Sequence, residues 1–158
     1  MNQAPTPNPW LAAVAPSPIG ETKRWVLGRS FPAERPLIDL SQAVPGYPPA
    51  LELRQHLGEL LLDPSVHGYT PILGLPVLRE AYASHLSSFY GAPIASSEVG
   101  ITSGCNQAFC LALMSLARAG DQVILPRPHY FNHDMWMRMQ GVEPVSLDFR
   151  PGSGAVPD

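Results

Sequence analysis

Residues 102–107 combine hydroxyl, amide and thiol side chains at a point where an expected strand gives way to an apolar helix. The free N–H groups at a helix N-terminus carry a partial positive charge and bind phosphate well. Gly104 lets the backbone come close to a ligand, and Ser103 and Asn106 can donate further hydrogen bonds. The segment lacks the Walker and dinucleotide-binding glycine patterns. It predicts a site for a single phosphate, although Ser103 could equally be an ordinary helix N-cap.

A second loop, residues 126–133, gathers aromatic, amide and imidazole side chains that could wall a flat ligand. The same aromatic rings could equally pack the end of a strand. His129 and His133 have the i, i+4 spacing of a metal-binding pair. Pro128 keeps His129 out of the helix interior, and no acidic partner accompanies the two histidines, so we expect no metal.

Cys105 and Cys110 are the two cysteines of the chain, and both fall in one expected helix. Cys105 at a helix N-terminus could have a lowered pKa and act as a nucleophile. The strongly apolar helix behind it favours inert packing instead. Two cysteines at this spacing make neither a disulfide framework nor a zinc site, which favours a reduced, cytoplasmic setting.

The composition excludes several classes of function. The chain has 158 residues, of which 45% are hydrophobic, so it is too apolar to be disordered. A formal net charge of −3 argues against a nucleic-acid-binding module. No apolar run approaches the roughly 20 residues of a membrane span, and the first residues do not resemble a signal peptide. We therefore expect a cytoplasmic protein that binds neither nucleic acid nor membrane.

The elements that must position the two loops follow an α/β pattern. Strands separated by helices with short connections predict a largely parallel sheet, which binds ligands beyond the carboxyl ends of its strands. Pro144 in the last strand indicates an edge or a bulge. The expected helices are 50–61, 76–90, a buried helix 106–118 and a Met-rich helix around 135–139, and the expected strands are 99–102, 122–125 and 142–149.

Ten of the 19 prolines fall within residues 1–49. Proline fixes φ and removes a backbone donor, so this part is predicted to be an extended arm with few regular elements. Trp10, Trp25 and Phe31 are costly to leave in water. We therefore expect the arm to pack on something, such as another subunit.

Four segments resemble, in order, motifs of class I/II aminotransferases, which are pyridoxal-phosphate enzymes of fold type I. Together they cover residues 38 to about 149. The segments are 38–49 (IDLSQAVPGYPP), 68–81 (GYTPILGLPVLREA), 101–108 (ITSGCNQA) and 119–130 (AGDQVILPRPHY).

The resemblance implies roles in binding pyridoxal phosphate. Ser103, Gly104 and Cys105, with Asn106, would hold the cofactor phosphate. Tyr130 would stack on the pyridine ring, where offset stacking adds roughly 1 kcal/mol beyond area burial.

Three further roles follow from the same resemblance. His133 falls, with Asn132, at the spacing of the aspartate aminotransferase subgroup, in which it would support an aspartate on the pyridine nitrogen. Tyr69 would reach the cofactor phosphate of a neighbouring subunit, because the family's sites straddle a homodimer. Gly46 would lie near the carboxylate of the amino acid or 2-oxo acid substrate.

One departure from the family is large. The family needs a lysine for its Schiff base, and Lys23, the single lysine, lies before every motif. Asp134 and Arg127 are in the wrong places to replace the family's later aspartate and basic residue. We thus expect no catalytic residue in this chain and no transamination by these 158 residues alone.

We predict the first part of a fold type I enzyme, with an incomplete three-layer αβα large domain behind a Pro-rich N-terminal arm. Residues 1–49 would form the arm and part of the small domain, and residues 50–158 the first half of the large domain. The full-length form would transfer amino groups between an amino acid and a 2-oxo acid. The alternatives are a carbon–sulfur lyase or acyltransferase of the same fold, or a non-catalytic remnant that acts in binding or dimerisation.

Overall fold

The structure is a computed structural model that describes residues 6–149 and 152. The contacts within the chain divide it into two compact units. The first combines the described parts of Met1–Gln42 and Gly104–Asp158, and the second is Ala43–Ser103.

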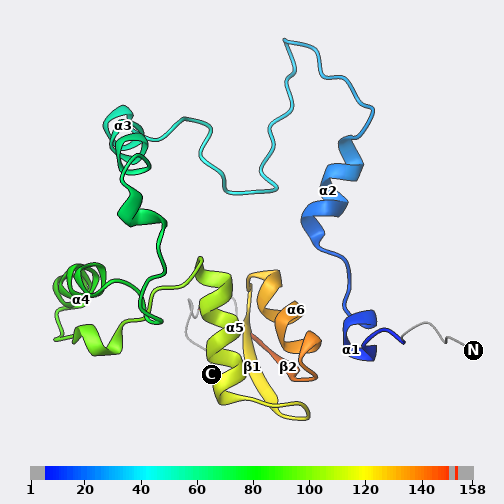
Figure 1. Ribbon diagram of the computed structural model, residues 1–158. Coiled ribbons are helices and arrows are strands. Elements are labelled where there is room, and N and C mark those ends of the chain that lie inside the picture. The colour runs from blue at the N-terminus through cyan, green and yellow to red at the C-terminus, as the bar shows by residue number, and fades with distance from the viewer. Residues whose placement is uncertain (1–5, 150–151, 153–158) are drawn as a thin grey trace, which may run out of the picture. The chain divides into compact units, whose positions relative to one another are not determined.

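The core of the first unit lies between two helices and a two-stranded sheet (Figure 1). Strands β1 (Gln122–Arg127) and β2 (Glu143–Asp148) pair in parallel, as predicted, with Gln122 opposite Glu143. Helices α5 (Cys105–Leu116) and α6 (Phe131–Met139) contact each other. The buried apolar cluster consists of Leu113, Leu125, Met137 and Val142.

The N-terminal arm contains more regular structure than its prolines predicted. Helices α1 (Pro9–Ala12) and α2 (Pro18–Val26) both begin with proline, because the first turn of a helix needs no N–H from that residue. Asn8 caps α1 by accepting a hydrogen bond from the Trp10 N–H at 3.0 Å.

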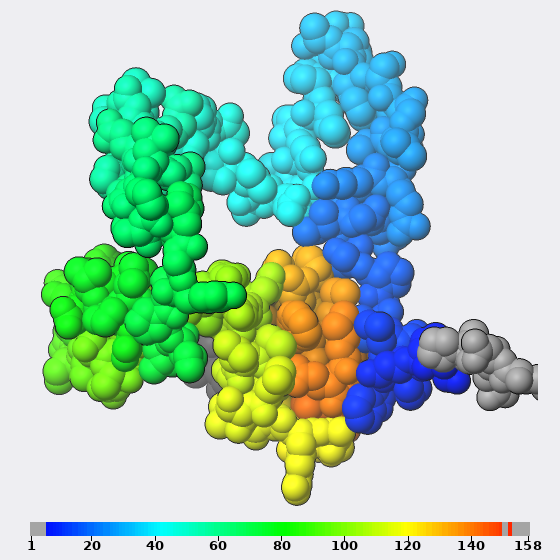
Figure 2. Space-filling view, in the orientation of Figure 1, coloured from blue at the N-terminus to red at the C-terminus, as the bar shows by residue number. Residues whose placement is uncertain are grey.

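The start of the arm packs on its own chain. Trp10 lies so close to Gly141 that a Cβ added there would sit 2.7 Å from the indole ring. In Figure 2 the blue residues of α1 accordingly lie against the orange residues near the end of α6. The arm was expected to pack on something, and Trp10 does so, on residues of its own chain.

The second unit is helical. It contains α3 (Leu51–Leu60), α4 (Pro76–Tyr90) and the short 3-10 helices η1 (Pro64–His67) and η2 (Ser96–Glu98). Helix α4 ends at Gly91, which has a left-handed φ of +66°. The predicted helices 50–61 and 76–90 are confirmed.

The predicted strand 99–102 is wrong. Its backbone groups bond outside any strand ladder, since the Val99 N–H donates to the nearby Ser96 carbonyl at 3.3 Å and the Ile101 N–H to the distant Leu73 carbonyl at 3.0 Å. The Val99 carbonyl accepts from the Arg79 guanidinium. A strand needs these groups for pairing with a neighbour, and here they are already engaged.

Pro144 sits opposite Val123 in an edge strand without a bulge, which is one of the two predicted alternatives. Two further boundaries or environments differ from the predictions. Strand β1 continues through Pro126 to Arg127, and Pro126 is paired in register with Leu147 of β2. Helix α5 ends at Leu116, which is 87% exposed, and Leu113 is its one buried residue among those described. The apolar face of α5 is therefore only partly covered.

Arg79 ties helix α4 to the segment that leads toward residue 104. Its Nε donates to the Val99 carbonyl at 2.7 Å and its Nη2 to the Ser96 carbonyl at 2.6 Å. Both bonds are charge-assisted, and Arg79 is half-buried. Arg79 lies in the motif of residues 68–81, but the sequence analysis predicted no role for it.

We expect Arg79→Met to lower the free energy of unfolding by roughly 1–3 kcal/mol, because two carbonyls lose a charged donor. Chemical denaturation followed by circular dichroism measures the change. Arg54→Met in the exposed helix α3 is the matched control and should change it by less than about 0.5 kcal/mol. Equal effects of the two substitutions would show that the carbonyl contacts contribute nothing.

Candidate active site

The first part of the candidate site is the N-terminus of α5. Gly104, and not Ser103, is the N-cap residue, with φ +86° and ψ 169°. This conformation is almost restricted to glycine. The first turn of α5 contains no acidic residue, and Cys105 is exposed. The helix start thus presents N–H groups and a partial positive charge, with no carboxylate in its own first turn.

Asn106 lies in the first turn of α5 beside a cavity of about 250 Å³. Its Oδ1 atom is buried and has no hydrogen-bond partner among the described residues. A buried amide oxygen without a donor is costly, and such atoms in native proteins commonly mark a missing ligand or water. The cavity is lined by Asn106, Asn132, Met135, Trp136 and Met139.

The second part of the site is a cluster of three rings. Tyr130 is the N-cap residue of α6, three residues beyond the carboxyl end of β1. The His133 imidazole meets the Tyr130 ring edge to face, with centroids 5.6 Å apart and an angle of 83°. The imidazole also stacks on the ring of Phe109 of α5, with centroids 4.0 Å apart and 18° between the ring planes. Asn132 Nδ2 donates to the Tyr130 hydroxyl at 2.9 Å.

His133 is favoured in its neutral form. Partial burial lowers its pKa below the ordinary value of 6.5, and the charge of His129 lowers the pKa further. The imidazole is therefore a neutral hydrogen-bonding group at neutral pH. Within residues 6–149 and 152, no three His, Cys, Asp or Glu side chains are grouped as a metal site would require.

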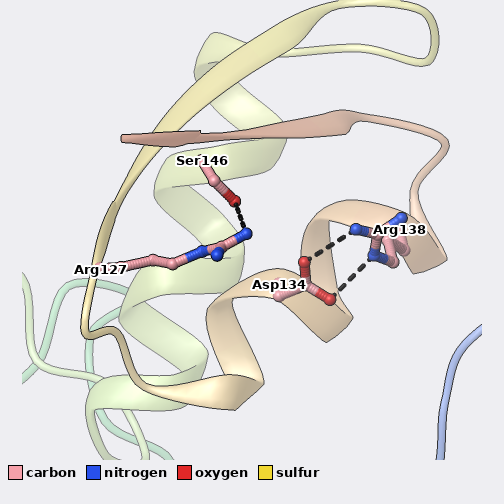
Figure 3. Close-up of polar contacts among 4 residues, drawn as sticks. All are labelled: Arg127, Asp134, Arg138 and Ser146. Carbon is pink, nitrogen blue, oxygen red and sulfur yellow. Dashed lines mark hydrogen bonds and ion pairs between the residues drawn. The ribbon is translucent and has the colours of Figure 1, made fainter. Parts of the chain in front are cut away.

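Two arginines of the first unit, on β1 and α6, have polar partners within that unit (Figure 3). Arg127, at the carboxyl end of β1, donates to the Ser146 hydroxyl at 2.7 Å and lies 3.6 Å from the Asp148 carboxylate. Asp134 accepts from Arg138 one helical turn later, at 2.8 Å. These side chains brace β2 and α6.

The structure brings several of the predicted site residues together in the first unit. Gly104, Cys105 and Asn106 lie at the start of α5, and Phe109 of the same helix contacts His133. Tyr130 and His133 lie at the start of α6. The remaining three, Gly46, Tyr69 and Ser103, belong to the second unit and are described only within it.

Within the second unit, Tyr69 is exposed and follows η1. Gly46 has open space around the position of a Cβ. Sequence reasoning missed the ring contact of Phe109, because an aromatic residue on an apolar helix is typical of a core. The signal that could have found it is the position of Phe109, one turn after Cys105 and therefore near the N-terminal end of the helix.

Comparisons with known proteins place these features in a family. The family model described as "Aminotransferase class I and II" matches residues 35–154. An aromatic aminotransferase of Arabidopsis thaliana, ISS1, is 36% identical over 121 residues, covering 77% of this chain and 30% of that protein. Transaminase BacF of Bacillus subtilis is 30% identical over 123 residues, covering 77% of this chain and 31% of BacF.

The fold agrees with this match. The substrate-bound structure of BacF superimposes with a TM-score of 0.82 and 26% identity, covering 100% of this chain and 39% of that one. The fold is therefore part of a fold type I aminotransferase, as predicted. The chain spans about a quarter to a third of the length of the curated relatives that it matches. With three quarters of its residues inside the family model, the chain belongs to the class I and II aminotransferases.

Proposed function

We propose that the protein containing this chain is a pyridoxal-phosphate-dependent aminotransferase that moves an amino group between an amino acid and a 2-oxo acid. We also propose that it acts in the cytoplasm as a homodimer. The observation that carries the proposal is the contact between two helix starts. The anion-attracting end of α5 and the Tyr130–His133 ring pair of α6 are joined through Phe109.

The described residues fit a phosphorylated aromatic cofactor. Among the described residues, no atom beyond its chain neighbours lies within 4 Å of the position of a Cβ on Gly104, so these residues leave room for a phosphate on that side of the helix end. The Nδ2 group of Asn106 can donate a hydrogen bond to a phosphate oxygen, and its buried Oδ1, which has no partner among the described residues, can accept one from a donor group of the cofactor. Backbone N–H groups at residues 104–106 would bind the phosphate, with Ser103 and Cys105 beside them.

Bound pyridoxal phosphate supplies an electron-accepting ring, which stabilises negative charge on the substrate carbon that loses a proton. Tyr130 would hold the plane of that ring by stacking. His133, neutral and fixed between two rings, would support the group that binds the pyridine nitrogen. Tyr69 and Gly46 would serve the partner's phosphate and the substrate carboxylate, respectively.

The residues of this chain bind and orient, and we assign proton transfer to none of them. Lys23, the single lysine, lies in α2 and lines a pocket of about 300 Å³ with residues 37–41. The lining of that pocket includes none of the predicted site residues.

The test uses the protein produced from its complete gene, titrated with pyridoxal phosphate and followed by absorbance. We expect binding, and then conversion of a 2-oxo acid to an amino acid when an amino donor is added. Tyr130→Ala should weaken cofactor binding about tenfold, whereas Tyr130→Phe, which loses only the bond to Asn132, should stay within about threefold. Failure of the wild-type protein to bind the cofactor would overturn the proposal. Release of product without an amino acceptor would favour a lyase.

A further inference from the structure

Phe109 makes a close, nearly parallel contact with a predicted site residue. Its ring centroid lies 4.0 Å from that of His133, with 18° between the planes. By comparison, the exposed Phe89 lies 6.5 Å from His85 in α4, at 27°. The Phe109 and His133 rings are therefore stacked in close face-to-face contact, whereas the rings of Phe89 and His85 lie much farther apart.

The imidazole of His133 is held from two directions. Phe109 covers one face, while Tyr130 meets the imidazole at 83°. The backbone is also fixed, because the His133 N–H donates to the Tyr130 carbonyl at 3.0 Å. The χ2 torsion of histidine has a broad minimum, so ring contacts decide its plane. Of the two contacts, only the Phe109 stack restrains the imidazole face to face.

We infer that Phe109 is a positioning residue that sets the plane of the His133 imidazole and thereby strengthens cofactor binding at this site. The inference rests on the proposed function for its cofactor part alone. Phe109 reaches across from α5, the helix that would bind the phosphate, to α6, which would carry the stacking ring. It therefore couples the two halves of the site through one side chain.

A purely structural role is the competing explanation, because Phe109 also packs against the buried cluster of Leu113, Leu125, Met137 and Val142. Phe109→Leu keeps an apolar side chain but removes the flat ring, whereas Phe109→Tyr keeps the ring. Phe89→Leu makes the same chemical change beside a different histidine, His85, and is the matched control.

The first measurement needs no cofactor. In the protein produced from its complete gene, nuclear Overhauser contacts between the ring protons of His133 and Tyr130 report the orientation of the imidazole. We expect Phe109→Leu to weaken these contacts, and Phe109→Tyr and Phe89→Leu to leave them unchanged. Unchanged contacts in Phe109→Leu would overturn the inference.

The second measurement is the dissociation constant for pyridoxal phosphate. We expect Phe109→Leu to raise it about two- to tenfold, Phe109→Tyr to restore it and Phe89→Leu to leave it unaltered. An unchanged constant, or no rescue by Phe109→Tyr, would overturn the role in cofactor binding. If the wild-type protein binds no cofactor, the proposed function fails, and the ring-proton contacts alone decide whether Phe109 orients His133.

Discussion

Gly74→Ala is expected to lower the free energy of unfolding of the unit formed by Ala43–Ser103 by about 3 kcal/mol or more. Gly74 has a φ of +95°, which an alanine adopts only with strain. A Cβ at this position would also lie 2.7 Å from both Cβ and Cγ1 of Ile101. Ile101 is β-branched and therefore stiff, so it cannot turn its side chain away cheaply.

The backbone around Gly74 cannot move aside without further loss. The Gly74 N–H donates to the Pro71 carbonyl at 2.8 Å, and the Ile101 N–H donates to the Leu73 carbonyl at 3.0 Å. Relieving the overlap would therefore break hydrogen bonds that join two distant parts of the unit. The strain and the overlap both act on the folded state, so their costs add.

Gly68→Ala is the matched control, because it makes the same change in the same motif. Gly68 has an ordinary φ of −82°, and its added Cβ would lie 3.8 Å from the Ser65 carbonyl oxygen. Alanine there should be neutral within about 0.5 kcal/mol. Hydrogen exchange of the amides in residues 43–103 measures both variants in the protein from its complete gene. Similar exchange in both variants would contradict the explanation.

Helices α3 and α4 could be predicted because their signals are local. Pro76 and Gly91 bracket α4, and the apolar spacing before Asp63 marks α3. Residues 99–102 have the apolar composition of a strand, but a strand also needs a pairing partner. The sequence could not show that Arg79 and Leu73 engage the backbone groups of that segment. The local composition therefore showed that residues 99–102 are apolar, but it did not show which groups their backbone bonds to.

The candidate site could be predicted in part, for a related reason. The chemistry of Gly104 and Asn106 follows from residue type and from a place at a helix start. The flat stacking of Phe109 on His133 joins residues 24 positions apart in the sequence, so it depends on how α5 and α6 pack. The sequence predicts Phe109 only as part of the buried helix 106–118, and Phe109 does pack against the buried cluster. Its contact with His133 depends on the packing of two helices, which the sequence alone does not show.

Gly104→Ala is expected to weaken binding of pyridoxal phosphate by about tenfold to a hundredfold. Gly104 has φ +86° and ψ 169°, a region in which an L-residue pays roughly 1–3 kcal/mol. Among the described residues, no atom beyond the chain neighbours of Gly104 lies within 4 Å of the added Cβ, so steric contact with them contributes nothing. The variant can escape the strain by changing its φ, but this rotation turns the N–H groups at the start of α5 away from a bound phosphate.

Gly100→Ala, four residues earlier, separates this backbone effect from the general loss of a glycine. Its added Cβ would make an ordinary contact of 3.8 Å with Leu73 Cδ2, and its φ lies outside the left-handed region. Cofactor titration of both variants should therefore show a large loss for Gly104→Ala and almost none for Gly100→Ala. A phosphate held mainly by side chains would leave Gly104→Ala binding like the wild-type protein, because Ser103 and Asn106 are unchanged. The size of the loss thus measures how far the backbone of α5, and not its side chains, binds the cofactor.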